Sequence, residues 1–475
     1  MPDLRRQIFE SGKTVSRKAA SRESSRPTSR TNSTQNSRHS SRNTSRHPTD
    51  DDEDAGNLSD ETAWSLGSLD ELTDNPDQDN GDWAQELGDR IQEILDRKRS
   101  SVQGREETYA AFCRLAKFHY IEEEIRGRVN DLVAAFCKSI KFESSVREST
   151  LALRALEFLA ITAFDNTIFE NAEPLLSRTI RDSTSNIIKA AAIHCLGTCS
   201  LFGGAGEDGI MDQMTFFLDI VASDGQSIDA PDDAGSVTAA LQEWGFMATE
   251  IEDLESESED AIQIFMDQLN SSEASVQVAA GENIALLYEK SYTPEEDDEA
   301  EDEEDEEDSE DETAETNGPK LVKRYEPYHN THELQQQLQS LATVHSKRIS
   351  KRDKKSLHSN FASILTTVEN PRRGPMYNTA IDQDTNRHYG SKFTVKVGRE
   401  GVMNIDRWWK WIRLNALRRM LQGGFAVHYF QGNRAVLDSL PVIMRMQTPS
   451  DRSGAKKSAR SRNTRHFAMH ESDEE

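Results

Sequence analysis

Apolar residues recur at helical spacing through the middle of the chain, and short polar breaks divide them into segments. Paired helices with short connections and no fixed repeat motif are typical of an armadillo/HEAT-like α-solenoid, in which each pair buries its apolar face against the next. Ser272 is predicted to cap the last of these helices through its hydroxyl oxygen. The helices are predicted, with no strand pattern of useful length between them, at residues 83–95, 108–120, 126–138, 146–164, 172–181, 185–199, 212–222, 236–249, 261–269 and 273–288.

The pattern changes after residue 320. A helix is predicted at residues 405–421, with Asp406 as its start signal and Gly423 and Gly424 as its stop signal. The chain is therefore predicted to be all-α, with the solenoid at residues 81–292 and a small, mostly helical, basic C-terminal domain at residues 321–445. Further elements of that domain are helices at 332–344, 357–368 and 433–440, a loop at 371–390, and one credible strand at 392–397, where apolar and polar residues alternate.

The helix at 405–421 differs from an ordinary surface helix, because apolar residues lie on two of its sides with basic residues between them. One hypothesis is a helix packed on both sides in a small domain, with its arginines extending to water along their aliphatic stems. The other is a basic, aromatic surface that meets the phosphates and base planes of RNA. The residues of that surface are Arg407, Trp408, Trp409, Lys410, Trp411, Arg413, Arg418 and Arg419.

Low-complexity sequence occupies residues 1–80, which hold repeated Ser-Arg pairs and then a run rich in Asp, Asn and Gly. Few apolar residues are present to offset the entropy of ordering, so a disordered tail is predicted. Arg precedes several serines by three residues, a spacing that basophilic kinases favour. The tail is either a solvated segment or a phosphorylation switch that cancels its positive charge. The candidate sites are Ser25, Ser29, Ser33, Ser41 and Ser45.

Charge is distributed unevenly along the 475 residues, whose formal net charge is −28. A disordered acidic linker is predicted at 293–320, where 17 of the residues from 295 to 315 are Asp or Glu, and Ser309 within it suits an acidophilic kinase. It is either a spacer or an internal nucleic-acid mimic. Residues 320–470 carry 28 Lys and Arg against 10 Asp and Glu, a net charge of +18, and the end of the chain at 446–475 is predicted to be a disordered basic tail. A basic third is thus tethered to an acidic middle, and this asymmetry favours a polyanionic partner.

A dense basic cluster precedes the helix predicted at 357–368. Its charge suits either a nuclear-import signal or a patch that contacts phosphates. It consists of Lys347, Arg348, Lys351, Arg352, Lys354 and Lys355.

Signals for catalysis, metal binding and membrane insertion are weak. Cys195 and Cys199 lie one helical turn apart beside His194, but no second pair with zinc spacing exists, and small buried cysteines are common in helical repeats. No enzyme, cofactor or small-molecule substrate is expected. No apolar run is long enough to span a membrane, and no signal peptide is seen. The four cysteines suit a reducing compartment, so the expected location is the cytoplasm, the nucleus or both.

Several stretches in order along residues 82–440 resemble the interferon-related developmental regulator family. Residues 276–289 resemble the end of that family's solenoid, and residues 338–343, the basic cluster and residues 361–369 look like the entry to its C-terminal domain. Residues 393–398, followed by Ile405, Asp406, Trp408, Ala416, Leu421, Gly424 and His428, look like its closing strand and helix. This chain departs from the family in its acidic tract, its long loop at 371–390, its extra tryptophans and its Ser/Arg-rich tail.

The resemblance implies an armadillo-like fold and a non-catalytic regulator of gene expression. Family members are linked to binding of non-translating ribosomes and to transcriptional co-regulation. Two hypotheses follow. The basic C-terminal domain binds the ribosome or its RNA and modulates translation, which agrees with the charge asymmetry. Alternatively, the protein is a nuclear co-regulator whose solenoid binds transcription-regulatory proteins.

Overall fold

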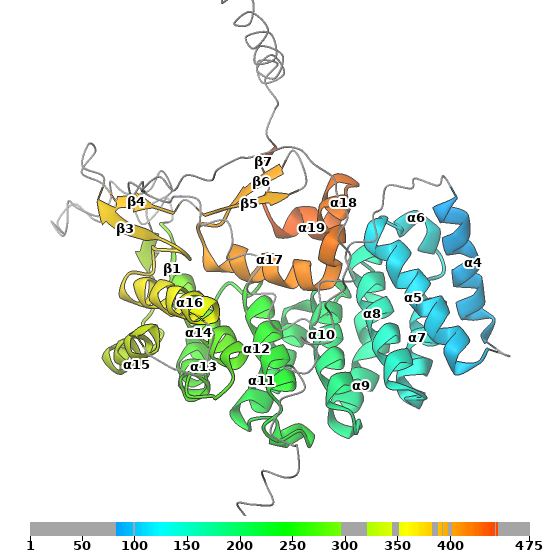
Figure 1. Cartoon of the computed structure of the whole chain (residues 1–475), viewed down its shortest axis with the longest axis horizontal. Coiled ribbons are helices and arrows are strands. Elements are labelled where there is room, and N and C mark those ends of the chain that lie inside the picture. The colour runs from blue at the N-terminus through cyan, green and yellow to red at the C-terminus, as the bar shows by residue number, and fades with distance from the viewer. Residues whose placement is uncertain are drawn as a thin grey trace, which may run out of the picture. The chain divides into compact units, whose positions relative to one another are not determined.

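A computed structural model describes residues 82–97, 100–295, 321–343, 351–381, 388–391, 393–397, 401–441 and 443–444 (Figure 1). These residues belong to one compact unit. The unit is an all-α solenoid of helical pairs with further C-terminal helices and short strands, so the predicted fold class is confirmed. The predicted tails at 1–80 and 446–475, and most of the predicted acidic linker, lie outside the described residues.

Five helical pairs form the solenoid. Its second helices, called the inner layer below, pack side by side in the order α5, α8, α10, α12 and α14, and the first helices line the other side. The short helices α6 (Glu122–Ile125) and η5 (Gln226–Ile228) lie in connections. The pairs are α4 (Trp83–Leu95) with α5 (Val102–Phe118), α7 (Val129–Phe142) with α8 (Val146–Ala163), α9 (Thr167–Asp182) with α10 (Asn186–Phe202), α11 (Gly206–Ala222) with α12 (Ala234–Ala248), and α13 (Glu255–Gln268) with α14 (Ala274–Lys290).

Capping side chains define where several inner-layer helices begin. Ser101, Ser145 and Asp233 accept hydrogen bonds from the backbone N–H three residues on, at the starts of α5, α8 and α12. The prediction that Ser272 caps α14 is wrong, because the helix begins one residue later, after Glu273, and has no side-chain cap. Four solenoid helices, α5, α9, α11 and α13, begin five or six residues before their predicted starts. The first turns of α11 and α13 are polar and largely exposed, so they carry little apolar periodicity. The first turn of α9 instead contains the buried Ile168, which the prediction missed.

The C-terminal helices are α15 (Thr331–Thr343), α16 (Lys351–Glu369), α17 (Trp408–Leu421), η7 (Gln422–Gly424), α18 (Phe425–Phe430) and α19 (Arg434–Ser439). Three small antiparallel sheets accompany them: β1 (Tyr292–Pro294) with β2 (Leu321–Lys323), β3 (Asn378–Ile381) with β4 (His388–Gly390), and β5 (Thr394–Val397) with β6 (Gly401–Asn404) and β7 (Ile443–Met444). The predicted loop at 371–390 and the prediction of a single strand are therefore wrong. The strand β3 is exposed along its whole length, so no alternation of burial marks it in the sequence.

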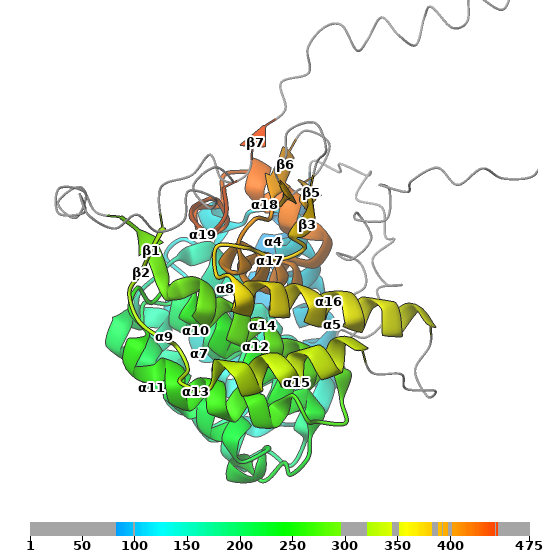
Figure 2. The same ribbon diagram turned by 90° about the vertical axis from the view of Figure 1, so that its left-hand side faces the viewer.

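The C-terminal helices cover the inner layer of the solenoid. The helix α16 packs on α14, α17 lies across α8, α12 and α14, α18 and η7 contact α5, and α19 contacts α8 (Figures 1 and 2). The approach of η7 to α5 requires glycine, because a Cβ at Gly424 would lie 1.8 Å from the carbonyl oxygen of Lys117. One continuous cluster of buried apolar residues includes both parts of the chain. The solenoid and the C-terminal helices therefore share a hydrophobic core.

Candidate functional site

The helix α17 is the central element of the contact between the two parts. It begins at Trp408, three residues after the predicted start, because Ile405 still donates its backbone N–H to Phe393 O at 2.8 Å as an extension of the sheet. As predicted, it is apolar on two sides: Leu414 and Leu417 are buried as well as Trp408 and Met420. The inner layer covers one side, and β5, β6, α18 and α19 lie over the other (Figure 1).

A carboxylate of the solenoid caps the first turn of α17. The two oxygens of Glu289 accept hydrogen bonds from the backbone N–H groups of Trp408 at 2.7 Å and Trp409 at 3.1 Å. The predicted cap, Asp406, is wrong, since its carboxylate accepts instead from Lys410 Nζ at 2.5 Å. Burial raises the pKa of Glu289 to about 7, although the positive charge of Arg407 acts in the opposite direction. The helix thus begins on a buried acidic group that lies 119 residues earlier in the sequence.

The indole groups of this helix are also engaged. Trp408 Nε1 donates to Thr367 Oγ1 at 2.7 Å, and Trp411 Nε1 donates to Glu282 Oε1 at 2.9 Å. Burial raises the pKa of Glu282 to about 7, against the lowering effect of the hydrogen bond from Trp411. Trp409 is half-buried, and the guanidinium of Arg413 lies 5.0 Å from its ring centroid. Two of the three tryptophans are therefore held by hydrogen bonds as well as by packing.

The last turn of α17 contributes a buried ion pair. Arg419, of which 6% is exposed, pairs with Glu243 of α12, whose side chain is fully buried. Glu243 also lies 2.8 Å from His194 Nδ1. Burial raises the pKa of Glu243 to about 7, opposed by Arg419, and burial together with the Arg419 charge holds the pKa of His194 well below its ordinary value. Arg154 of α8 donates to Arg419 O at 2.8 Å.

A third basic residue of α17 holds the loop between α12 and α13. Arg413 Nε donates to Thr249 Oγ1 at 2.9 Å, and its Nη2 donates to Thr249 O at 3.0 Å and pairs with Glu250 Oε1 at 2.8 Å. The side chain is 14% exposed, and burial lowers its pKa. The positive charge of Arg413 is therefore paired with a carboxylate of the same protein.

The geometry agrees with a helix packed on both sides, but Arg413 and Arg419 reach carboxylate and carbonyl groups of the solenoid rather than water. Among the residues predicted to contact RNA, Trp408, Trp411 and Arg419 are buried, and Arg407, Trp409, Lys410, Arg413 and Arg418 are partly buried. Contact with RNA stays a prediction for all eight. The acidic partners Glu243, Glu282 and Glu289 were not predicted. Their signal in the sequence is a carboxylate within an otherwise largely apolar helical stretch, one in α12 and two in α14.

Four of the six residues of the predicted basic cluster lie at the start of α16. Lys351, Arg352, Lys354 and Lys355 fall in its first two turns, and Figure 2 shows this end of the helix projecting past the solenoid. Their side chains, together with Lys347 and Arg348, are outside the described residues, as are the candidate phosphorylation sites Ser25, Ser29, Ser33, Ser41, Ser45 and Ser309.

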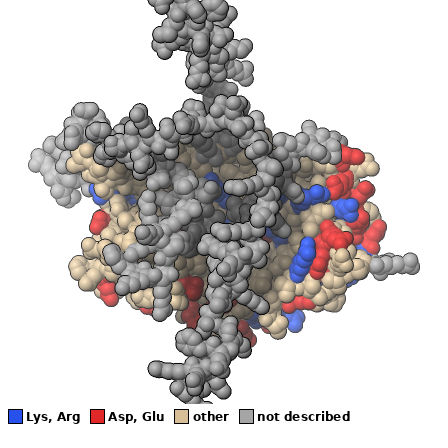
Figure 3. All heavy atoms as spheres, in the orientation of Figure 1, with Lys and Arg blue, Asp and Glu red and all other residues tan. Residues whose placement is uncertain are grey.

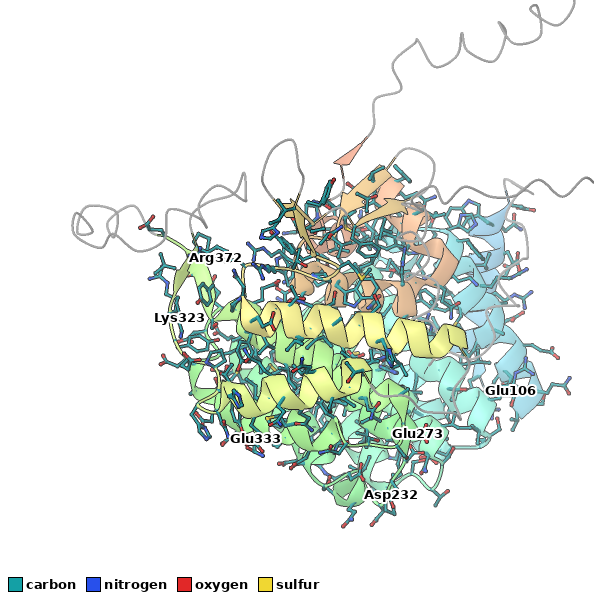
Figure 4. All side chains as sticks on the ribbon, turned by 60° about the vertical axis from the view of Figure 1, so that its left-hand side comes forward. Glu106, Asp232, Glu273, Lys323, Glu333 and Arg372 are labelled. Atoms are coloured by element: carbon teal, nitrogen blue, oxygen red, sulfur yellow. The ribbon has the colours of Figure 1, made fainter. Side chains whose placement is uncertain are left out.

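The solenoid surface is acidic in its second half. Residues 190–289 contain 20 Asp and Glu and no Lys or Arg. Figure 4 places Asp232 and Glu273 on the lower side of the solenoid, away from the C-terminal strands, whereas Figure 3 shows acidic and basic side chains intermingled on the N-terminal helices. Polyanions are therefore expected to avoid this half of the protein.

The histidine and cysteines singled out in the sequence lie together in α10. Cys195 and Cys199 are buried within α10, and burial raises the pKa of the Cys195 thiol. Their neighbour His194 bonds to Glu243. Within the described ranges, no group of three or more His, Cys, Asp or Glu residues is placed to hold a metal ion. None of the helices that the structure describes is long and apolar enough to cross a membrane.

Comparison with known proteins gave two findings. The sequence model of the family described as interferon-related developmental regulator matches residues 40–369, from before the solenoid to the end of α16. A Schizosaccharomyces pombe protein described as uncharacterized is 25% identical over 373 residues, which cover 76% of this chain and 77% of that protein.

Proposed function

The chain belongs to the interferon-related developmental regulator family, and on that premise we propose that it is a non-catalytic regulator of gene expression whose basic C-terminal part binds the ribosome or its RNA and modulates translation. The observation that supports this most is the separation of charge. Residues 320–470 carry a net charge of +18, whereas residues 190–289 contain no Lys or Arg. A polyanion would approach the former and be repelled by the latter.

Because α17 is buried, we expect the phosphates of the RNA to contact other residues. Undocking this helix would expose six large apolar side chains at about 1.5–3 kcal/mol each, a cost on the order of 10 kcal/mol. They are Trp408, Trp411, Leu414, Leu417, Met420 and Leu421. The start of α16 projects past the solenoid (Figure 2). We therefore assign the phosphate contacts to Lys347, Arg348, Lys351, Arg352, Lys354 and Lys355.

Charge reversal tests this assignment. In the cluster variant, Lys351, Arg352, Lys354 and Lys355 are each replaced by Glu. The matched control reverses four exposed arginines of the solenoid, Arg114, Arg126, Arg147 and Arg178, whose side chains are 58–72% exposed. Sedimentation with ribosomes is measured at low and moderate salt, from growing and starved cells.

We expect the wild type to co-sediment, more so on starvation and less at moderate salt. The cluster variant should lose this association, because each phosphate contact adds to the salt dependence of binding. The control should behave as wild type. An equal loss of ribosome association in the two variants, or no association of the wild type under any condition, would contradict the proposal.

A nuclear co-regulator is the alternative. In that case the basic cluster directs import, and the solenoid binds partner proteins. The helices α17, α18 and α19 cover much of the inner layer, so a partner would have to bind another face. A reporter fused to residues 344–356 that stays cytoplasmic would count against this alternative.

A further inference from the structure

The connection between α12 and α13 carries a repeated acidic pattern. Thr249 is followed by acidic residues at the first, third and fourth positions, Glu250, Glu252 and Asp253. Ser256 is followed at the same three positions by Glu257, Glu259 and Asp260. Kinases that recognise acidic substrates select a hydroxyl with this arrangement of carboxylates after it. With no Lys or Arg between residues 190 and 289, a kinase that requires basic residues has nothing to bind here.

The two hydroxyl groups have the same pattern and opposite environments. Thr249 is only 7% exposed. Its hydroxyl donates to Phe246 O at 2.7 Å and accepts from Arg413 Nε at 2.9 Å. Modification would remove that donor and place two negative charges in the shared core. Thr249 is therefore closed to a kinase in the folded protein.

Ser256 lies in the first turn of α13 and is exposed. Its hydroxyl donates to Glu257 Oε1 at 2.8 Å, an exposed contact between adjacent residues that opens easily. The preceding connection, residues 249–254, is not helical, and the first N–H groups of a helix have no intrahelical acceptor, so the first turn opens at low cost. Leu254 and Ser258 on either side of it are buried, whereas Ser256, Glu259 and Asp260 are exposed. A kinase can therefore reach the hydroxyl and two of its acidic determinants from the solvent side and needs to open only the first turn of α13.

We propose that Ser256 is a phosphorylation site for an acidophilic serine/threonine kinase that uses a nucleoside triphosphate. The Ser256 oxygen forms a bond to the γ-phosphorus, and the bond from that phosphorus to the β-phosphate oxygen breaks. The hydroxyl proton passes to a base of the kinase, and the nucleoside diphosphate leaves. The product carries about −1.5 to −2 charges at neutral pH.

The modified residue would lie where the C-terminal part begins its contact with α13. A phosphate at the second position of α13 sits at the positive end of the helix dipole, which favours it. One turn further on, Glu259 pairs with the imidazole of His329, and a turn beyond that Gln263 accepts from Tyr328 OH at 2.9 Å. The phosphate would therefore offer His329 a second anionic partner. Phosphorylation is expected to hold residues 325–329 more firmly on α13.

The test uses the folded full-length protein, an acidophilic kinase and ATP, with each site identified by mass spectrometry. The unfolded chain serves as a reference, because it shows how readily the kinase phosphorylates each sequence when neither hydroxyl is buried. In the folded protein we expect near-complete phosphate at Ser256 and none at Thr249, whereas both are labelled in the unfolded chain. Ser256→Ala should abolish the label at that position, and Ser256→Thr should retain it.

Two results would overturn the proposal. One is a Ser256 that is labelled in the unfolded chain but stays unmodified in the folded protein. The other is a Thr249 that is labelled as fast as Ser256 when the protein is folded, because burial would then have no influence. The matched variant Thr249→Ala controls for the assignment of neighbouring peptides.

Discussion

Replacing Glu289 with Ala tests whether a carboxylate of the solenoid determines the start of α17. The substitution removes the acceptor of two backbone N–H groups, those of Trp408 and Trp409. Loss of a capping side chain costs about 1 kcal/mol, and a buried N–H left without a partner costs about 1–3 kcal/mol more. We expect the free energy of unfolding to fall by about 2–4 kcal/mol. Glu289→Gln keeps one acceptor oxygen and should cost less.

Two measurements follow this change. Urea unfolding monitored by tryptophan fluorescence gives the free energy by linear extrapolation, and hydrogen exchange reports whether the amides of α17 lose protection first. The matched control is Glu273→Ala, which removes an exposed carboxylate at the start of α14 that makes no cap hydrogen bond. The control should stay within about 0.5 kcal/mol of wild type. A Glu289→Ala protein as stable as the control would refute the proposed capping.

Three further predictions concern the same interface. Burial raises the pKa of Glu282 from 4.5 to about 7. The stability that its protonated form provides is therefore full below about pH 4.5 and is lost as the pH rises to 7. Glu282→Gln should make the free energy of unfolding, measured by urea titration, depend less on pH between pH 5 and 8, and an unchanged pH dependence would contradict this. Arg419→Ala leaves Glu243 buried without its cation and should cost about 3–5 kcal/mol, whereas the double variant Arg419→Met, Glu243→Gln should recover much of the loss in the same titrations. Gly424→Ala should lower stability by about 1–3 kcal/mol, because the new Cβ would clash with Lys117 O. Gly88→Ala in α4, where no atom lies within 4 Å of the new Cβ, should raise stability by up to about 1 kcal/mol. Thermal unfolding temperatures that shift in the same direction for both variants would be inconsistent with this.

The helical pairs and the uneven charge could be predicted from the sequence, because both are properties of local composition. The period of the apolar residues identified the ten main helices of the solenoid, although first turns that face water, such as those of α5 and α13, lack that period and were missed. The two apolar sides of the segment at 405–421 likewise predicted a helix packed on both sides.

The partners of that helix were decided by tertiary structure. Nothing near Arg419 in the sequence indicates Glu243, and nothing near Trp408 indicates Glu289, since each pair meets only after the chain returns over the inner layer. The cost of burying a charge depends on such distant neighbours. The same reason separates Thr249 from Ser256. Their sequence patterns match, but only one hydroxyl faces water. Periodicity thus determined which segments become helices, and the meeting of distant residues determined which of their polar groups remain available for function.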